Sequence, residues 1–466
     1  MDYNTETLTN LAQQVGDALK AALAQHMQTG EQALTMADIE KEMRELLRRL
    51  GAQALSQFLS SALGTPVAEM PCACGGILHY QRRRAATITT VFGRITYARA
   101  YYAGCRCGRG KAPVDERYGL EPGAMSSGLA ALLGLAGIEF GFDESRDWLQ
   151  AFLLFDVSEN TVRSETQTFG TLQAEREAAL CQQSQDADFL QARLRETTPL
   201  PPRLYGSLDA AKVRIEPRPQ AGKKPEKQDD WRDLKVGCWY EAEPVPAAQR
   251  SVRQRDKFDR EQTVLRAKHM RYYCDMREAE EFGKLMWGTG CAVKADLVPE
   301  LVLVCDGAVW IWNLVALHYP QAVQIVDWYH AEDRLKRVAH AAFPVDCDRA
   351  TWLEQATTDL WEGRVADVID ACQALALRCE DARHAVTYFT NNAQRMRYDQ
   401  FRAAGYLIGS GTVESGCKQI VTQRLKRPGA QWTVDGAVRT AKARAAWLSG
   451  EWETLCAQRA ALPLAV

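Results

Sequence analysis

Three acids in separate parts of the chain have the residue type and surroundings of a shared cation site: Asp209 in LYGSLDAAK, Asp306 in LVLVCDGAVW and Glu414 in GSGTVESG. Converging carboxylates repel one another and raise their own proton affinity unless a divalent cation compensates them. Because oxygen-only ligands favour magnesium or manganese, these acids predict a Mg²⁺ or Mn²⁺ site. Such ions support in-line phosphoryl transfer by activating a water or a 3′-hydroxyl, as DNA strand cleavage and strand transfer require.

A further acid and a histidine stand in VDWYH, as Asp327 and His330, after an apolar stretch. Two interpretations are open. Either Asp327 caps a helix and His330 is a surface residue, or both support the acid site. A single aspartate at the end of a strand is more often a cap or turn residue, so the predicted chemistry depends on the acids acting jointly.

Four of the fourteen cysteines form a pattern: Cys72, Cys74, Cys105 and Cys107 flank a β-hairpin in two pairs. This layout predicts a four-thiolate zinc ribbon. Both pairs are Cys-x-Cys, whereas zinc knuckles usually have two or more intervening residues, so reduced structural thiols are the alternative. A disulfide is less expected than either in a cytoplasm.

Basic residues are concentrated in two segments, although the net charge is only −2. Residues 71–117 carry nine bases against two acids, and residues 415–445 carry seven against one. Such patches suit a polyanion, and solvated faces are the alternative. Trp432 has two interpretations, a ring that stacks on an unpaired base or a core residue. The residues predicted to contact DNA are Arg82, Arg83, Arg84, Lys418, Arg424, Lys426, Arg427 and Trp432, with Arg94 and Arg99 on the same hairpin as the first three.

The elements that must position the acids follow from periodicity. Strands are predicted at residues 204–215, 234–240, 270–275, 301–305 and 323–326, with helices at 277–286 and 309–317. Three strands, a helix, a strand, a helix and a strand is the RNase H-like order. In such a sheet Asp209 lies on the first strand and Asp306 ends the fourth, next to it. Glu414 begins a helix that packs across the sheet after a helical stretch from about residue 328 to 392.

The fold class predicted from these patterns is multidomain α+β, with an RNase H-like α/β core that contains a helical insertion. A helical N-terminal region, a zinc-ribbon-like β-hairpin and a helix-turn-helix-like segment, with a break near Asp156 and a cap at Ser158, precede that core. The predicted boundaries are 1–66 (helical), 67–117 (hairpin), 118–200 (helix-turn-helix-like), 201–342 (core, first part), 343–400 (insertion) and 401–466 (core, last part).

Composition excludes several classes of protein. Hydrophobic residues make up 46% of the chain and charged residues 25%, which is typical of globular proteins and unlike disordered chains. The longest apolar stretch, residues 129–142, is too short to cross a bilayer and contains Glu139. The first residues, MDYNTETLTN, are acidic and polar where a secretory signal would be basic and then apolar. We therefore expect a cytoplasmic protein without a membrane partner.

Over roughly residues 71–452 the chain resembles the DDE transposases of bacterial insertion sequences, in particular the Kra-type group and its Mutator-like relatives. The resemblance rests on CDGAVWIW, on Asp327-x-x-His330, on GSGTVESGCKQIVTQRLKRPGAQW and on the cysteine-flanked hairpin that ends in CGRGKAPVDERYGL.

The resemblance implies a catalytic triad of Asp209, Asp306 and Glu414, with Asp229, Asp230 and Asp233 as downstream alternatives to the first acid. It also implies a helical insertion between the second and third acids, and the double-stranded DNA of terminal inverted repeats and target sites as substrate. The resemblance further implies a bacterial, nucleoid-associated protein, and we expect a homodimer or higher oligomer on DNA. Two other functions stay open: a structure-selective nuclease with the same acids, and a catalytically silent, domesticated DNA-binding protein.

Overall fold

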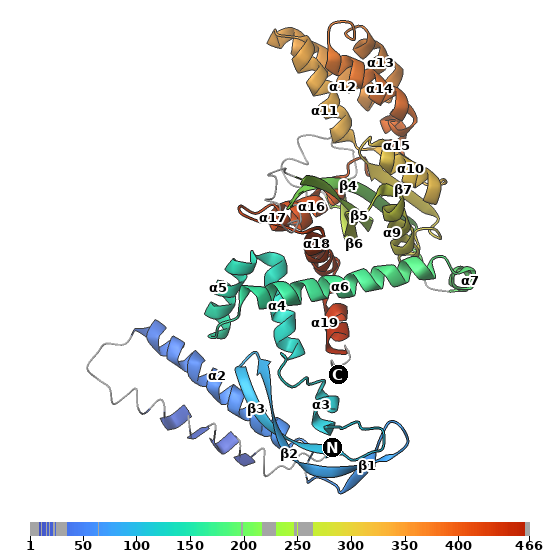
Figure 1. Ribbon diagram of the computed structural model, residues 1–466. Helices are drawn as coiled ribbons and strands as arrows, with labels where there is room; N and C mark the ends of the chain where they lie inside the picture. Colours follow the sequence, from blue (N-terminus) through green and yellow to red (C-terminus); the bar gives the residue numbers. More distant parts are fainter. Residues whose placement is uncertain are drawn as a thin grey trace, which may run out of the picture. The chain divides into compact units, whose positions relative to one another are not determined.

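The computed structural model describes residues 35–63, 65–196, 199–216, 230–246, 249 and 264–461, with some positions between 9 and 24. The chain forms two compact units, Met1–Phe169 with Glu453–Val466 (unit 1) and Gly170–Trp452 (unit 2). Two of the six predicted segments, 118–200 and 401–466, cross the boundary between these units, and the predicted division into segments stays a prediction. Helices and two sheets make the fold a mixture of α and β structure, as predicted (Figure 1). Among the described helices, none is both long and apolar enough to cross a membrane.

Unit 1 is built around a three-stranded antiparallel sheet in the order β1-β2-β3. The predicted hairpin is confirmed: Thr90 pairs with Gly93 across a two-residue turn, and the positive φ of Gly93 (99°) is one that glycine adopts without strain. Alternate residues of the hairpin, such as Ile88 and Tyr97, form a buried core with Leu59 of helix α2. The elements are α2 (Met36–Ser61), β1 (Glu69–Pro71), β2 (Ile77–Thr90) and β3 (Gly93–Ala103).

The helices of unit 1 include the predicted helix-turn-helix-like pair, α5 and α6. Ser158 caps α6 as predicted, because its Oγ accepts the Thr161 N–H at 3.1 Å. Leu133 of α4, Leu149 of α5 and Val162 of α6 share a core. The helices are α3 (Pro113–Tyr118), α4 (Ser127–Glu139), α5 (Phe142–Leu153), α6 (Glu159–Gln183), which continues into unit 2, and α19 (Trp452–Ala461). For the predicted N-terminal helical region, α2 confirms the part from residue 36, whereas residues 1–8 and 25–34 lie outside the described chain.

Unit 2 contains a five-stranded sheet in the order β6-β5-β4-β7-β8. The strands β6, β5 and β4 are antiparallel neighbours, whereas β4, β7 and β8 are parallel. All five predicted strands are present, the second and third longer than predicted. They are β4 (Arg203–Ile215), β5 (Asp230–Pro244), β6 (Leu265–Asp275), β7 (Glu300–Cys305) and β8 (Val323–Val326).

Helices cover both faces of this sheet. The adjacent residues Tyr272 and Tyr273 of β6 mark the two faces, because neighbouring side chains of a strand point to opposite sides. Tyr273 stacks on Phe282 of α9, whereas Tyr272 donates to the Thr412 carbonyl of α16. The covering helices and the segments joined to them are α9 (Ala279–Ala292), α10 (Val309–His318), α16 (Gly411–Cys417), the π-helix η3 (Lys418–Thr422), α17 (Gln423–Leu425) and α18 (Val434–Leu448).

Between β8 and α16 the chain is helical, as predicted. In Figure 1 the helices α11 to α14 form a bundle beyond the sheet of unit 2. The elements of this part are α11 (Trp328–Ala342), α12 (Asp346–Trp361), α13 (Val365–Gln373), α14 (Glu380–Asn392), the 3-10 helix η2 (Ala393–Arg395) and α15 (Tyr398–Ala403). The short helix α7 (Ala187–Leu194) precedes β4.

Candidate functional site

Asp209 and Asp306 lie on neighbouring parallel strands. The ladder between β4 and β7, continued in the same register by three residues, sets Asp209 opposite Asp306. The Leu208 N–H donates to Cys305 Sγ at 3.3 Å, so the two strands stay adjacent up to the acids. Since residues in register point to the same face of a sheet, these two carboxylates share one face.

Asp327 joins the same row from β8. Cys305 pairs with Val326, so the next residues along, Asp306 and Asp327, lie opposite each other. The Asp327 N–H donates to the Cys305 carbonyl at 2.7 Å, which holds the two chain segments together at this point. Three acids from three neighbouring strands therefore form one row, which we call the acid row: Asp209, Asp306 and Asp327.

The acid row faces α16, the helix that carries Glu414. On the other side of Asp209 the row continues through Val236 to Cys274, which lies two residues from Tyr272 and so shares its face. Tyr272 is the residue that donates to α16. Burial raises the pKa of the Cys417 thiol on the same helix, and the negative charge of Asp209 raises it further, so α16 lies against the acid row. Glu414 stands in the first turn of that helix.

Asp306 is a desolvated carboxylate beside a second one. Burial raises its pKa above the ordinary value and the negative charge of Asp209 acts in the same direction, while the Ala308 N–H donates to its Oδ1 at 2.9 Å and opposes the shift. Like charges that are held together in a partly buried place favour binding of a cation. Asp306 is thus a desolvated acid that a nearby cation would stabilise.

Asp327 has a different environment. It is fully buried, and its two oxygens accept backbone N–H groups, Oδ1 from His330 at 2.7 Å and Oδ2 from Ser410. It is the N-cap of α11, as one of the two interpretations predicted. The hydrogen bond from Ser410 to Asp327 also ties the segment before Glu414 to the end of β8. A second contact acts in the same way, since the Trp328 N–H donates to the Ile408 carbonyl at 2.8 Å.

His330 connects Asp327 to Glu414. Its Nδ1 lies 3.1 Å from Asp327 Oδ1 and 3.6 Å from Glu414 Oε1. The hydrogen bond to Asp327 raises the pKa of His330 to about 9 against the opposing effect of burial, and the negative charges of Asp327, Glu414 and Asp306 contribute to the rise. The neighbouring carboxylates therefore favour the protonated imidazole, which acts as their counter-ion.

The donor atoms fit a divalent cation in part. One potential ligand atom each from Asp327, His330 and Glu414 lie within 4.8 Å of one another. Asp209 and Asp306 are not in that group, and their link to it is the shared row and the electrostatic effects on Asp306, His330 and Cys417. Carboxylate oxygens are the ligands that magnesium and manganese favour, and the nearby acids compensate the charge of such an ion.

The four predicted cysteines converge in unit 1. Their sulfur atoms lie within 4.8 Å of one another, with Cys72–Cys107 and Cys72–Cys74 at 3.5 Å and Cys74–Cys105 at 3.3 Å. A disulfide needs about 2.05 Å, so these thiols are not paired that way. Four thiolates around zinc at about 2.3 Å would be separated by roughly 3.8 Å, close to the observed spacing. The cluster could hold a metal such as zinc.

Glycines shape both ends of the cysteine cluster. Each pair reads Cys-x-Cys-Gly, and in both the glycine has a positive φ, 85° at Gly75 and 73° at Gly108. The Gly75 N–H donates to the Cys72 carbonyl and the Gly108 N–H to the Cys105 carbonyl, each at 3.0 Å. Tight turns of this kind let two residues of a short Cys-x-Cys motif reach one point.

A third glycine, Gly76, leaves room for the sulfurs. A Cβ at Gly76 would lie 2.7 Å from Cys105 Sγ and 3.6 Å from Cys74 Sγ. The hydrogen bond from the backbone of the same glycine, together with hydrogen bonds from the neighbouring cysteines, lowers the pKa of Cys74 to about 6. Thiolate is the form that binds a metal, so this turn suits a metal site.

The hairpin arginines lie on β2 and are exposed. Arg82 forms no hydrogen bond or ion pair with the described residues. Arg83 donates to the Ser60 carbonyl at 2.8 Å, and Arg84 lies 3.7 Å above the ring of Tyr101. Of the two further arginines on β3, Arg94 is exposed, whereas Arg99 is paired with Asp115 at 2.6 Å. The exposed members of this set form a basic surface.

Two residues of the predicted DNA-contacting set near Glu414 are buried instead. Arg424 is 2% exposed and lies 5.1 Å above the ring of Trp432, which is itself 5% exposed. The indole Nε1 of Trp432 donates to the Leu425 carbonyl at 2.9 Å. The core interpretation of Trp432 therefore fits, and neither side chain is exposed for contact with DNA in this structure, because both are buried. Lys418 and Lys426 are exposed and Arg427 is partly exposed.

The downstream alternatives to Asp209 lie apart from the acid row. Asp230 accepts from Arg232 at 2.9 Å and Asp233 pairs with Lys212 at 3.1 Å, both on the part of β5 before Val236. Asp229 lies outside the described residues. Asp209 is therefore the acid of this region that joins the row.

Sequence reasoning missed residues that support or adjoin the site. Ser410 holds Asp327 through its N–H, and its Oγ donates to Glu414 at 3.1 Å. Arg334 stands four residues after His330 on α11, a spacing that puts both on one helix face and that could have indicated it. Its charge lowers the pKa of Asp306 against the larger effect of burial.

A scan against protein-family models returns no match, and neither does a search of curated proteins.

Proposed function

We propose that the protein is a DNA transposase of the DDE type, which cleaves and joins DNA strands at terminal inverted repeats with divalent metal ions. The observation that carries the proposal is the acid row, Asp209, Asp306 and Asp327, which follows when the β4–β7 and β7–β8 ladders are extended past their last pairs, together with the nearby helix of Glu414. Acids from distant parts of a sequence converge in this way where a cation must be held.

The sheet of unit 2 supports an RNase H-like core as part of the proposal. Its first three strands are antiparallel neighbours and its fourth and fifth are added in parallel to the first, in the order β6-β5-β4-β7-β8. The helices α9 and α10 fall between the strands as that order requires. The helices from α11 to α15 separate Asp306 from Glu414, as a helical insertion would.

The residues divide into those that would hold metal and those that would position them. Asp209, Asp306 and Glu414 would bind magnesium or manganese, which when bound supplies Lewis-acid activation of the attacking and leaving oxygens. Asp327 and His330 are positioning residues, since Asp327 uses its oxygens on backbone N–H groups and His330 bridges it to Glu414. The cysteine cluster would be a zinc site that stabilises the basic hairpin.

The test is Asp306→Asn in a nicking assay. The substrate is a duplex that carries the inverted repeats flanking the coding sequence, with magnesium present. We expect loss of nicking by at least about a hundredfold, because the variant lacks the charge that holds the cation while keeping the shape of the side chain. Binding of the same duplex without divalent metal should remain at the wild-type level. Retained nicking would overturn the assignment of Asp306.

Two other functions are separated by companion experiments. A structure-selective nuclease would nick but would not join the cleaved 3′ end to a second duplex. A silent DNA-binding protein would bind the repeats without nicking at any magnesium concentration. The row of three acids favours an enzyme over the silent protein, since a DNA-binding surface gains nothing from desolvated negative charge.

A further inference from the structure

Residues 404–410 connect α15 to α16, and we call this segment the strap. Its backbone turns at Gly405, whose positive φ of 68° is one that glycine adopts without strain, and it ends at Ser410, the N-cap of α16. Glu414 follows four residues later, in the first turn of that helix. The position of Glu414 at the acid row therefore depends on what holds the strap.

Three contacts place the strap along the acid-row face of the sheet. Arg203, Tyr205 and Asp209 share that face, because residues separated by an even number of positions along a strand point to the same side. The contacts follow β4 from its start to the acid row: Arg203 donates to the Gly405 carbonyl at 2.8 Å, the Leu407 N–H donates to the Tyr205 hydroxyl at 3.3 Å, and the Ser410 N–H donates to Asp327. The strap thus runs beside β4 as far as the acid row.

Arg203, Glu300 and Tyr406 hold the start of the strap, and we call these three residues the anchor. Arg203 and Glu300 are paired in the β4–β7 ladder, and the Arg203 Nε donates to Glu300 Oε2. The Tyr406 hydroxyl donates to the other oxygen, Oε1, and its ring centroid lies 4.3 Å from the Arg203 guanidinium. The guanidinium also donates to the Ala404 and Gly405 carbonyls, at the C-terminal end of α15, where a cation is favoured. The anchor therefore fixes the strap to two strands at once.

The anchor and the acids stand at opposite ends of the same two strands. Six positions separate Arg203 from Asp209, and six separate Glu300 from Asp306. At about 3.3 Å per residue this distance is about 20 Å, and the strap covers it with the same number of positions. A slip of the strap by one residue would move Glu414 by about 3.3 Å, which is more than the length of about 2.1 Å of a bond from magnesium to oxygen.

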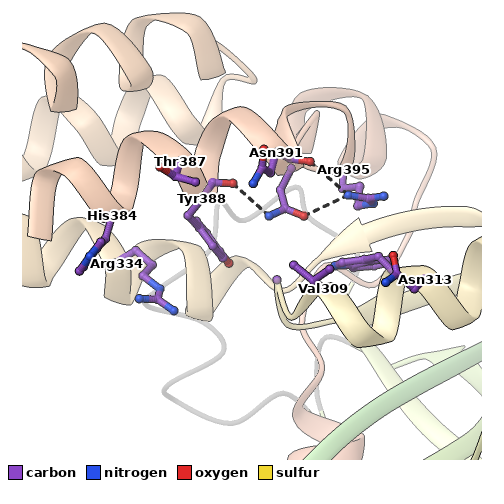
Figure 2. Close-up of a pocket in the computed structure, with 11 residues that line it drawn as sticks. Val309, Asn313, Arg334, His384, Thr387, Tyr388, Asn391 and Arg395 are labelled. Atoms are coloured by element: carbon purple, nitrogen blue, oxygen red, sulfur yellow. Dashed lines mark hydrogen bonds between the residues drawn. The ribbon is translucent and has the colours of Figure 1, made fainter. Parts of the chain in front are cut away.

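Separate contacts hold the helices before the strap to β8. Arg395, just after α14, donates to Gln324 at 2.8 Å, and the Tyr398 hydroxyl of α15 donates to the Val326 carbonyl at 2.9 Å. Figure 2 shows Arg395 beside Asn391, at a pocket of about 550 Å³ that is lined by residues of α10, α11 and α14. These contacts fix α15 at residues that precede the strap, so the start of the strap itself is left to the anchor.

We propose that Arg203, Glu300 and Tyr406 are positioning residues that set how far Glu414 reaches into the acid row. The inference rests on the proposed function, in which Glu414 binds a metal ion. The anchor uses its charges and hydrogen bonds on the strap and on the two strands, about 20 Å from the acids, so it acts on the metal only through Glu414. Without the anchor the strap can shift along the sheet, and Glu414 then leaves the distance at which it shares a cation with Asp306.

The experiment measures binding of Mn²⁺ alone to the full chain without DNA, from the electron paramagnetic resonance signal of the free ion. Carboxylates suit manganese, whereas thiolates select zinc, so the cysteine cluster does not compete. We expect binding to weaken about threefold in Tyr406→Phe, which loses one hydrogen bond, and about tenfold in Arg203→Gln, which loses the ion pair and both carbonyl contacts. Glu414→Gln, in the same assay, gives the effect of losing the ligand itself.

Nicking provides a second readout that a purely structural role would not change. Both anchor variants should need more magnesium for a half-maximal rate, by the same factors as for manganese binding, and should approach the wild-type rate at saturating magnesium. Arg203→Lys should recover part of the affinity, because an ammonium can pair with Glu300 but lacks the planar fork that reaches the strap carbonyls as well. Binding of duplex DNA without metal should stay at the wild-type level in all three variants.

The matched control is Arg193→Gln, which removes a comparable ion pair of unit 2 outside the anchor and the strap. Arg193 is 4% exposed and donates to Asp296 at 2.7 Å. This variant should lower the melting temperature in chelator and keep the wild-type affinity for manganese. A loss of affinity as large as that in Arg203→Gln would assign the effect to general stability and overturn the positioning role.

The remaining outcomes separate this inference from the proposed function. Wild-type manganese affinity in both anchor variants, together with weakened binding in Glu414→Gln, overturns the positioning role alone. Wild-type affinity in Glu414→Gln removes Glu414 from the metal site and overturns both. Manganese binding that depends on Glu414 and on the anchor, in a protein that does not nick, supports the positioning role and rejects the enzymatic function.

Discussion

Asp306 and Asp327 show how the same residue type acquires different roles from its surroundings. Both follow a buried parallel strand and both lie in the acid row. Asp327 receives N–H donors on both of its oxygens, so its charge is stabilised by the backbone. Among the described residues Asp306 receives one backbone donor, at Oδ1, and it is desolvated beside Asp209, so its pKa is raised. The carboxylate of Asp327 therefore stabilises the fold, whereas the carboxylate of Asp306 is available to a cation.

We therefore predict that the two asparagine variants differ in their free energy of unfolding in metal-free buffer. Asp327→Asn should lower the free energy of unfolding by about 1–3 kcal/mol, because an amide cannot accept at both positions and its NH₂ would face a backbone donor. Asp306→Asn should not destabilise the protein, since it removes a charge that the fold disfavours. Thermal unfolding of the three proteins in a chelator measures the difference.

Magnesium provides the control within the same experiment. A ligand that binds the folded state raises the melting temperature, so magnesium should stabilise the wild type and have little effect on Asp306→Asn. Asp306→Asn melting below Asp327→Asn in chelator would contradict the two assignments.

At the scale of elements, the sequence predicted most of what positions the acids. Strand β8 and the start of α10 were predicted to the residue, because continuous apolar runs end abruptly at Asp327 and begin after Gly307. Long-range register was not predictable from a single chain. The pairing that puts Asp209 opposite Asp306 depends on how residues almost a hundred positions apart align across the sheet.

The burial of charged residues could not be predicted from the sequence either. Arg424 stands in a run of basic residues, QRLKRP, yet it is buried because the chain after Glu414 forms a π-helix, η3, before α17. The extra residue in such a turn rotates the following side chains, so helical periodicity gives the wrong face for Arg424. The Arg444 Nε donates to the Gln419 carbonyl of η3 at 2.6 Å, and that tertiary contact stabilises the turn.

The cysteine turns lead to a prediction about metal content. Gly76→Ala should lower the zinc content of the purified protein well below one ion per chain, because its Cβ would lie 2.7 Å from Cys105 Sγ and push the sulfurs apart. Elemental analysis of the full chain measures this. Gly128→Ala is the matched control, since a Cβ there meets nothing within 4 Å on a helix of the same unit. Equal zinc in both variants would show that the cluster tolerates the displacement.

The packing of α9 on α10 predicts a pH effect on stability. Burial lowers the pKa of His318, whose ring stacks on Trp287 with centroids 6.2 Å apart and whose Nε2 has no partner among the described residues. Below a pH of about 6.5 His318 is protonated in the unfolded chain, whereas burial opposes its protonation in the folded chain. The free energy of unfolding therefore has its full value above that pH and decreases as the pH falls.

His318→Phe should therefore lose less stability than the wild type between pH 7.5 and 5.5. Urea unfolding at both pH values gives the comparison, and His340→Gln, at an exposed position of α11, is the control. A variant with the same pH dependence as the wild type would mean that His318 is already solvated in the native state.

For the whole molecule, the division of charge between the two units matters more than the net charge of −2. Unit 1 carries the cysteine cluster and the exposed arginines of β2, and unit 2 carries the acid row with Lys418 and Lys426 near Glu414. An acidic site cannot attract DNA by itself, since phosphate and carboxylate repel. If the protein binds DNA as proposed, its affinity for the polyanion must come from the basic surfaces of the two units.

The last prediction follows from this division. Binding of duplex DNA should weaken as salt rises, because each phosphate contact releases counter-ions, with a slope of about −0.9 per contact in log affinity against log salt. Arg82→Ala with Arg84→Ala should make the slope shallower by about two contacts, and so should Lys418→Ala with Lys426→Ala. If both surfaces bind DNA independently, the combined variant should lose the sum of the two. The control is Lys336→Ala, a lysine that is paired with Glu332 at 2.8 Å on α11. An unchanged slope for either pair would assign DNA binding to the other unit alone, and that result would leave the acid row dependent on the remaining basic surface to bring DNA to it.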